Sequence, residues 1–361
     1  MRDFLHSPLN EKKVIRHGKK YIRYEILGGD GPGASKTRVH FDDGSHEDCD
    51  VLISAEGSGS RANKQLGLNN IVEVKTMGAG GVLGKCHLPS SVLSSLPLPL
   101  LEKGTLFTST ASASIFAAAY LPDGLASSTQ ASSQSHDLSR ATKPSEYDES
   151  QASLMVAITW QEGISSAEAS QLPDKKEFLR KKLSEGGCHP DYLKLVDALD
   201  ASAIQGFPVR TAKHTPVNWR QKALARSTAS SDRNIANPRV WLMGDAIHPM
   251  LPSRGMGANQ AIHDAADALS PLLELARQKA LHGCCTDQQV QAQLALYEAA
   301  MIPRAFVWVK RSAVQVLPDL DSFRGKMMLL SMRIMLAFVG TFMGILKLFG
   351  WKPKDDAPEL P

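Results

Sequence analysis

The 361-residue sequence lacks the marks of several common protein classes. Its five cysteines form no CxxC pair, and their odd number favours a reduced, intracellular setting over a disulfide framework. Its eleven histidines form no HxH or HxxxH pair with an acidic partner, so a metal hydrolase is poorly supported and no metal site is expected. The first twenty residues are polar and charged, which is not the pattern of a signal peptide.

An excess of charge of one sign is missing as well. The 41 Lys and Arg residues nearly balance the 37 Asp and Glu residues, which leaves a net charge of +4. The basic residues are scattered rather than interleaved with aromatic ones, so nucleic-acid binding has no support. With 43% hydrophobic residues, the chain has ample apolar content for the core of one large domain or two ordinary ones.

The most informative stretch is 239–269. The short apolar run Val240–Met243 predicts a buried strand, Gly244 and Asp245 end it, and a glycine-rich loop then leads into an Ala-rich helix. Such glycines let a ligand approach the backbone, and the amides at a helix N-terminus favour negative charge. An Asp beside such a site suits ligand hydroxyls better than phosphate. The stretch therefore predicts binding of a polyol with an electron-rich or anionic part.

This stretch resembles the GD motif, GDAxHxxxPxxGxGxNxAxxDA, of the FAD-dependent aromatic hydroxylases and related class A flavin monooxygenases. The matching positions are Gly244, Asp245, Ala246, His248, Pro252, Gly255, Gly257, Asn259, Ala261, Asp264 and Ala265. The resemblance implies that Asp245 binds the ribitol chain of FAD and that amides near 255–259 stabilise negative charge on reduced flavin. The cofactor site it implies here comprises Gly244, Asp245, Pro252, Gly255, Met256, Gly257, Ala258 and Asn259.

A second window, 50–67, pairs a predicted buried strand with a turn of small residues and a basic helix. It resembles the DG motif of the same family, GADGxxSxxR. Gly57 and Ser60 match this motif, whereas Glu56 replaces its Asp. Ser54 and Asn63 are further departures, and Arg61 can supply the displaced positive charge. The resemblance implies that Glu56 and Gly57 lie near both FAD and the nicotinamide cofactor.

The strand, GxGxxG loop and helix that open full-length family members have no match in this sequence. Gly29, Gly31 and Ala34 satisfy GxGxxA, but the residues after them alternate like a strand, so we predict a hairpin loop at 28–33. Without the missing unit, FAD affinity should fall sharply, because its glycines bring the backbone to the pyrophosphate. Arg2 fits the RxxLxxxL helix whose Arg touches FAD in relatives. The sequence leaves open a shortened gene model or a real fragment.

The resemblance and the periodicity together predict an α/β fold. It comprises an incomplete, glutathione-reductase-like FAD-binding domain of the Rossmann type, a mixed β-sheet substrate domain and a C-terminal hydrophobic helix. The predicted domains are FAD binding at 1–70 and 219–275, substrate at 71–218 with a flexible insert at 125–150, and a helical region at 276–325. Strands are predicted at 13–16, 20–27, 36–41, 50–54, 81–88, 105–121 and 153–161, and further helices at 174–185, 190–200 and 288–313.

A hydrophobic helix is predicted at 326–350. Met327–Leu346 is twenty residues long and is interrupted by one charge, Arg333. That length can cross a bilayer, and an Arg a third of the way in can extend towards the headgroups. The sequence therefore predicts a membrane-associated helix, spanning or interfacial. The alternative is a terminal helix that packs on the protein or on another copy.

The function implied by the resemblance is oxygenation by an FAD-dependent monooxygenase. In the family, NAD(P)H reduces FAD and O2 then supplies one oxygen atom to an aromatic or polyene-type organic molecule. No catalytic acid or base is assigned: His248 is either a base or structural, and its place in the motif favours the structural role. Arg210 either faces a substrate acid or lies on the surface. The alternatives are a flavin-dependent reductase and a non-catalytic remnant.

Overall fold

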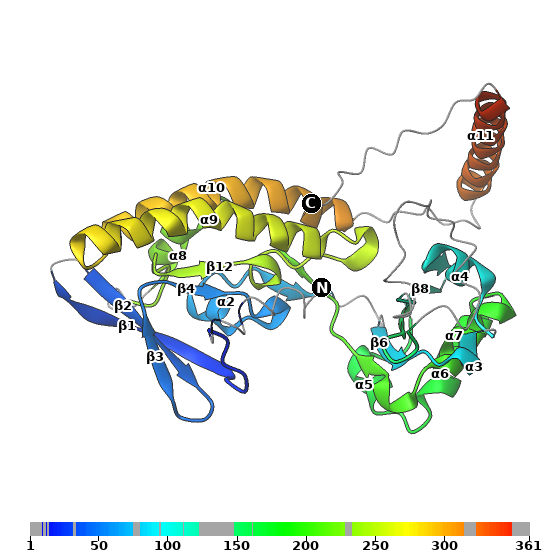
Figure 1. Cartoon of the computed structure of the whole chain (residues 1–361), viewed down its shortest axis with the longest axis horizontal. Coiled ribbons are helices and arrows are strands. Elements are labelled where there is room, and N and C mark those ends of the chain that lie inside the picture. The colour runs from blue at the N-terminus through cyan, green and yellow to red at the C-terminus, as the bar shows by residue number, and fades with distance from the viewer. Residues whose placement is uncertain are drawn as a thin grey trace. The chain divides into compact units, whose positions relative to one another are not determined.

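A computed structural model describes residues 9, 12, 14–31, 34–74, 80–93, 95–110, 112–122, 148–160, 162–227, 233–313 and 323–348 (Figure 1). The chain divides into two compact units, each with its own hydrophobic core. The first unit comprises residues 1–74 and 208–314, and the second comprises 75–207 and 315–361. Arg2 and most of the insert predicted at 125–150 lie outside the described residues.

The first unit begins with an antiparallel hairpin. Strand β1 (Tyr21–Gly31) pairs with β2 (Ala34–Phe41), and Gly31 lies opposite Ala34, which confirms the predicted hairpin. Residues 28–31 belong to β1 rather than to its loop, and 32–33 lie outside the described residues. Strand β3 (His46–Cys49) extends this sheet and was not predicted, because its residues are polar and mostly exposed. The strand predicted at 13–16 is wrong for 14–16, which form no regular element.

A parallel pair of strands forms the centre of the first unit. The fully apolar strand β12 (Val240–Leu242) pairs with β4 (Leu52–Ser54), so two segments far apart in sequence run side by side. Every side chain of β12 is buried, as expected for a parallel strand covered on both faces. The Trp241 ring stacks on Tyr297 with centroids 5.3 Å apart, and the Tyr297 hydroxyl donates a hydrogen bond to the Leu242 carbonyl.

Two long helices pack against each other over this pair: α9 (Gly257–His282) and α10 (Asp287–Ser312) (Figure 1). Helix α9 ends at Gly283 in the left-handed region, and α10 begins with a capping box between Thr286 and Gln289. Shorter elements complete the unit: α2 (Arg61–Gln65), β5 (Ile71–Glu73), β11 (Arg210–Ala212) and α8 (Trp219–Arg226), with β5 and β11 paired antiparallel.

A buried cation joins these pieces. The Arg239 side chain is fully buried just before β12, and it donates hydrogen bonds to the carbonyls of Asp50 and Cys285 and to the Asp287 carboxylate at 2.6 Å. Asp287 also accepts a hydrogen bond from the Ser35 hydroxyl at 2.7 Å. One guanidinium therefore links the starts of β4, β12 and α10, and through Asp287 it also reaches β2.

Within the described residues, the second unit holds a five-stranded antiparallel sheet in the order β10-β6-β9-β8-β7. Its strands are β6 (Gly80–His87), β7 (Thr105–Ser109), β8 (Ala113–Tyr120), β9 (Ser153–Trp160) and β10 (Gln205–Gly206). Strand β9 alternates strictly between buried and half-buried side chains, which confirms the strand predicted at 153–161. The stretch 105–121 forms two strands, β7 and β8.

Five helices of this unit fall in its described part before residue 207: α3 (Ser90–Leu93), α4 (Leu98–Lys103), α5 (Ser166–Ser170), α6 (Lys175–Glu185) and α7 (Pro190–Ala198). The helices predicted at 174–185 and 190–200 are thereby confirmed. The break between the two helices was also predicted, and Gly186 is the C-cap residue of α6.

Residues Phe323–Leu348 form the helix α11. Its described side chains include exposed apolar ones, such as Phe323, Ile334 and Phe338. In the part of the chain that the structure describes, no helix combines the length and the apolar character that crossing a membrane requires.

Candidate functional site

The candidate site lies where β4 and β12 end. Because parallel strands present their carboxyl ends at the same edge, the turns that follow them come together there, at the usual ligand position of α/β sheets. The turn η1 (Gly57–Gly59) follows β4, the turn η5 (Gly244–Ala246) follows β12, and the two turns contact each other. We call these turns, with the first turn of α9, the carboxyl-edge site.

Asp245 presents an open carboxylate at this edge. Its backbone neighbours Gly244 and Ala246 are buried, whereas the Asp245 side chain is exposed and accepts no hydrogen bond from any described residue. Loss of hydration raises the pKa of its carboxyl above the usual value, and His248 acts in the opposite direction. The carboxylate is therefore available to accept hydrogen bonds from a ligand.

The start of α9 faces this carboxylate. A methyl group built on Gly257 would lie 3.9 Å from Asp245 Oδ1, so the helix begins directly beside the carboxylate. The N-cap residue, Met256, makes no side-chain cap, which leaves the first amides of the helix without a side-chain partner. Pro252, Gly255, Ala258 and Asn259 are exposed around them. An acceptor and several donors thus lie side by side at this edge.

Two glycines of this loop adopt backbone conformations that other residues rarely accept. Gly244 has φ +59° and Gly255 has φ +60°, both in the left-handed region. Gly244 also packs closely: a Cβ atom there would lie 3.1 Å from the Ala261 Cβ of α9. The turn η5 therefore rests directly on the helix that follows it.

A buried ionic network holds η5 against α9 and α10. The Asp264 carboxylate of α9 is fully buried; its Oδ2 accepts a hydrogen bond from the Gly244 amide at 2.8 Å and lies 2.6 Å from His248 Nε2. Its Oδ1 accepts from Arg304 Nη2 of α10 at 2.8 Å. Arg304 also donates to Asp267 and Gln260. Asp264 therefore connects the turn to both helices.

The protonation of Asp264 follows from these contacts. Burial by itself raises the pKa of the carboxyl, but the hydrogen bonds from His248, the Gly244 amide and Arg304 outweigh it, and the pKa lies below its usual value. The carboxylate is thus ionised and compensated by Arg304. His248 is fully buried and is engaged with Asp264, which agrees with the structural role that its place in the motif favoured.

On the β4 side, Glu56 caps a helix. Its carboxylate accepts hydrogen bonds from the hydroxyls of Ser54 and Ser60, both at 2.8 Å, and from the Ala62 amide at 3.1 Å. These contacts fix η1 and the start of α2. Above the same turn, Arg210 donates to the Ser58 carbonyl at 3.3 Å, so its guanidinium belongs to the carboxyl-edge site rather than to the open surface.

The structure therefore brings together all of the predicted cofactor residues except Arg2, which lies outside the described residues. Their binding of FAD remains a prediction. The sequence did not identify Arg304 as part of the site, and it left Arg210 between a contact with a substrate acid and the surface. The position of Arg304 on the helical face that carries Tyr297 and Met301 was the available signal, because an Arg on a buried face needs an acidic partner.

The comparisons with known proteins bear on this geometry. Residues 204–286 match the family model of an FAD binding domain. The dual O-methyltransferase/FAD-dependent monooxygenase elcB of Phaeosphaeria nodorum is 25% identical over 332 residues, which cover 87% of this chain and 33% of that protein. The aurachin C monooxygenase/isomerase of Stigmatella aurantiaca is 32% identical over 133 residues, which cover 37% of this chain and 27% of that protein. The chain thus spans a third or less of the length of these curated relatives.

Solved structures share the fold. Klebsiella pneumoniae HpxO, complexed with FAD and uric acid, aligns with a TM-score of 0.52 at 19% identity, over 86% of this chain and 61% of that chain. An FAD-containing monooxygenase from Photorhabdus luminescens aligns with a TM-score of 0.51 at 20% identity, over 87% of this chain and 73% of that chain. With the matched FAD-binding region and the two motif turns at one sheet edge, these likenesses lead to one conclusion: residues 204–286 match an FAD-binding domain, and the chain is similar to class A FAD-dependent monooxygenases.

Proposed function

We propose that this chain is an FAD-dependent monooxygenase and that its carboxyl-edge site holds the flavin half of the cofactor. The observation that carries the proposal is the open Asp245 carboxylate beside the uncapped start of α9. Ribitol presents hydroxyl donors that suit a free carboxylate, and the edge of the flavin pyrimidine presents acceptors that suit helix amides. The described residues therefore fit this half of FAD.

The groups that hold the cofactor are assigned as follows. Asp245 would accept hydrogen bonds from ribitol hydroxyls, and the amides at 257–259 would donate to the flavin ring. Arg210, above η1, would add positive charge at the same edge. When bound, FAD would supply the redox chemistry by which NAD(P)H and O2 oxygenate a substrate. The protein residues named here bind and orient the cofactor, and none is assigned as an acid or base.

The substrate is proposed to be an aromatic or polyene-type small molecule. The support is indirect: HpxO, which shares the fold, is complexed with uric acid, an aromatic heterocycle. A flavin-dependent reductase and a non-catalytic remnant are the alternatives. Oxygen-dependent product formation distinguishes the first alternative from a monooxygenase. A purified protein that stays colourless with added FAD would favour the remnant.

Replacing Asp245 by alanine should weaken FAD binding by about tenfold or more, because a ligand hydroxyl loses its charged acceptor. The measurement is a titration followed by flavin fluorescence. The FAD affinity of Asp245→Asn should lie between those of the wild-type protein and Asp245→Ala, since an amide oxygen still accepts a hydrogen bond. Thermal stability should change little, because the Asp245 carboxylate makes no hydrogen bond to a described residue. Equal affinities in the wild-type protein and Asp245→Ala would refute the assignment.

A further inference from the structure

A groove separate from the carboxyl-edge site runs along one face of α10. The residues Gln291, Ala295, Glu298, Ile302 and Phe306 follow one another at intervals of three or four, so they share a helical face. The loop 214–218 and the start of α8 form the opposite wall. Two pockets, of about 330 Å³ and about 430 Å³, lie along this face and both contact Val217. We treat them as the two ends of one groove.

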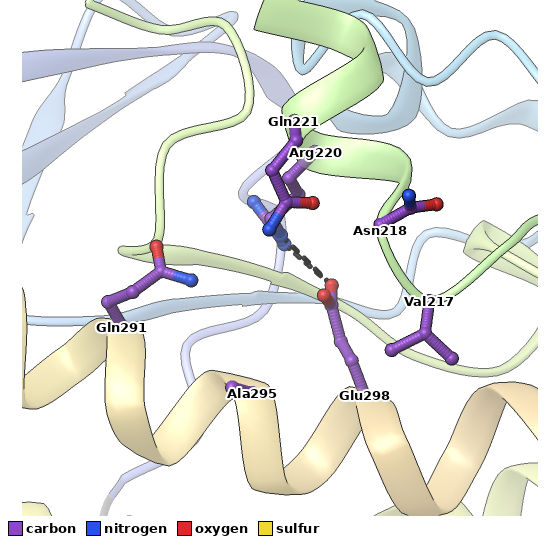
Figure 2. Close-up of a pocket in the computed structure, with 7 residues that line it drawn as sticks. All are labelled: Val217, Asn218, Arg220, Gln221, Gln291, Ala295 and Glu298. Atoms are coloured by element: carbon purple, nitrogen blue, oxygen red, sulfur yellow. Dashed lines mark hydrogen bonds and ion pairs between the residues drawn. The ribbon is translucent and has the colours of Figure 1, made fainter.

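The first end of the groove is polar and holds an unused acceptor. Figure 2 shows Glu298 rising from α10 towards Arg220, with the amides of Asn218, Gln221 and Gln291 around the space. Glu298 is only 5% exposed. Its Oε1 accepts from Arg220 Nε at 3.0 Å and from the Trp219 indole at 3.3 Å, whereas its Oε2 has no partner among the described residues.

The charge at this end is already balanced. Arg220 directs its remaining donors to the carbonyls of Asn237 and Val240, at 2.8 and 2.9 Å, so it is held in place as the partner of Glu298. The Arg220–Glu298 pair has no net charge, so a ligand ammonium or carboxylate would lose hydration at this end without a net opposite charge to offset the loss. A neutral hydroxyl or amide N–H can donate to the free Oε2 with a smaller loss of hydration.

The second end of the groove is mostly apolar, although Lys310 also lines it. Ile302, Pro303, Phe306 and Val307 of α10 face Pro216 across it, and His214 packs edge-on against the Phe306 ring with centroids 6.1 Å apart. A volume of about 430 Å³ is within the range of sites that accept small organic molecules. This end can therefore bury a ring or a short hydrocarbon chain.

We infer that this groove binds a small apolar molecule that carries a neutral hydrogen-bond donor. The donor would bind Glu298 Oε2, and the apolar body would lie against Ile302 and Phe306. The site lies wholly within the first unit and uses none of the residues assigned to FAD. It therefore goes beyond the proposed function and does not depend on it.

Three probes with one apolar body separate the chemistry: 3-phenylpropan-1-ol, 3-phenylpropylamine and 3-phenylpropionate. Saturation-transfer NMR with the full chain should show saturable binding of the alcohol. The amine and the carboxylate should bind at least about tenfold more weakly, because each loses more hydration than the hydroxyl does, beside an ion pair that has no net charge. Equal binding of all three, or no binding of the alcohol, would overturn the inference.

A pair of matched variants locates the site. Ala295→Leu adds bulk at the polar end and leaves the Arg220 and Glu298 side chains themselves unchanged, and it should weaken alcohol binding by about tenfold or more. Ala300→Leu places the same side chain at an exposed position of α10 that lines neither pocket, and it should bind like the wild-type protein. Asp245→Ala should also retain alcohol binding, even if it loses FAD. Loss in Ala300→Leu alone would contradict the assigned location.

Discussion

Replacing Asp264 by alanine should lower the free energy of unfolding by about 3–5 kcal/mol, the usual cost of removing one partner from a buried ion pair. Asp264 is fully buried and is shared by the Gly244 amide, His248 and Arg304. Its removal leaves the Arg304 guanidinium without its buried partner and releases the turn η5 from α9. Urea unfolding followed by circular dichroism measures this loss of stability. The FAD affinity of the variant should fall as well.

Asp267→Ala is the matched control. Asp267 binds the same Arg304 nitrogen at 2.8 Å but is partly exposed, so its loss should cost no more than about 1 kcal/mol. If the two variants were equally destabilised, the prediction that Asp264 contributes more to stability than Asp267 would be wrong. If neither were destabilised, the network would contribute nothing to folding.

The Asp264 carboxylate also makes the stability of the fold depend on pH, and the sign of this dependence follows from its pKa. The pKa of Asp264 is lower in the folded protein than in the unfolded chain, because its hydrogen bonds outweigh the effect of burial. Its contribution to stability is therefore fully present above the unfolded value, near 4, and is lost as the pH falls through the folded value. The difference in stability between wild type and Asp264→Ala should shrink below about pH 4.

Gly257→Val should reduce FAD affinity by about a hundredfold or more, since an added isopropyl group would occupy the space beside Asp245 that the cofactor needs. A Cβ atom at Gly257 meets only ordinary contacts, the nearest being Asp245 Oδ1 at 3.9 Å, so the fold should accept the change. The added bulk would instead lie between the carboxylate and the helix amides. Flavin fluorescence and the thermal midpoint, measured together, separate binding from stability.

Ala265→Val provides the control for Gly257→Val, because Ala265 is exposed on the same helix two turns further on. Valine costs less than about 1 kcal/mol of helix propensity relative to alanine, and position 265 is remote from Asp245. FAD binding should be unchanged in this control. Normal FAD affinity in Gly257→Val would show that the cofactor does not approach the start of α9.

The sequence predicted the elements that carry strong local signals. The run Val240–Met243 and the loop glycines led to β12 and the start of α9, and the alternation at 153–161 led to β9. Strand β3 was missed because its stability comes from pairing with β2 and not from apolar side chains. No spacing rule shows that Arg304 reaches Asp264, since forty residues separate them and only the packing of α10 on α9 joins them.

The role of Glu56 illustrates the same limit. The motif comparison assigned it to the cofactor, while the structure engages its carboxylate with Ser54, Ser60 and the Ala62 amide. A carboxylate bound in this way has less capacity left for a ligand than Asp245 has. Which of two acidic residues is free depends on the hydrogen bonds around them, and these are set by tertiary structure.

The hydrogen bond from the Gly244 amide to Asp264 has a consequence for local dynamics. This amide can exchange its proton with solvent only when α9 withdraws from the turn, because its acceptor has no access to water. Deuterium uptake at this single peptide group therefore reports how often the turn η5 separates from α9. Because Asp245 belongs to the same turn, each such separation would also displace the proposed ribitol ligand.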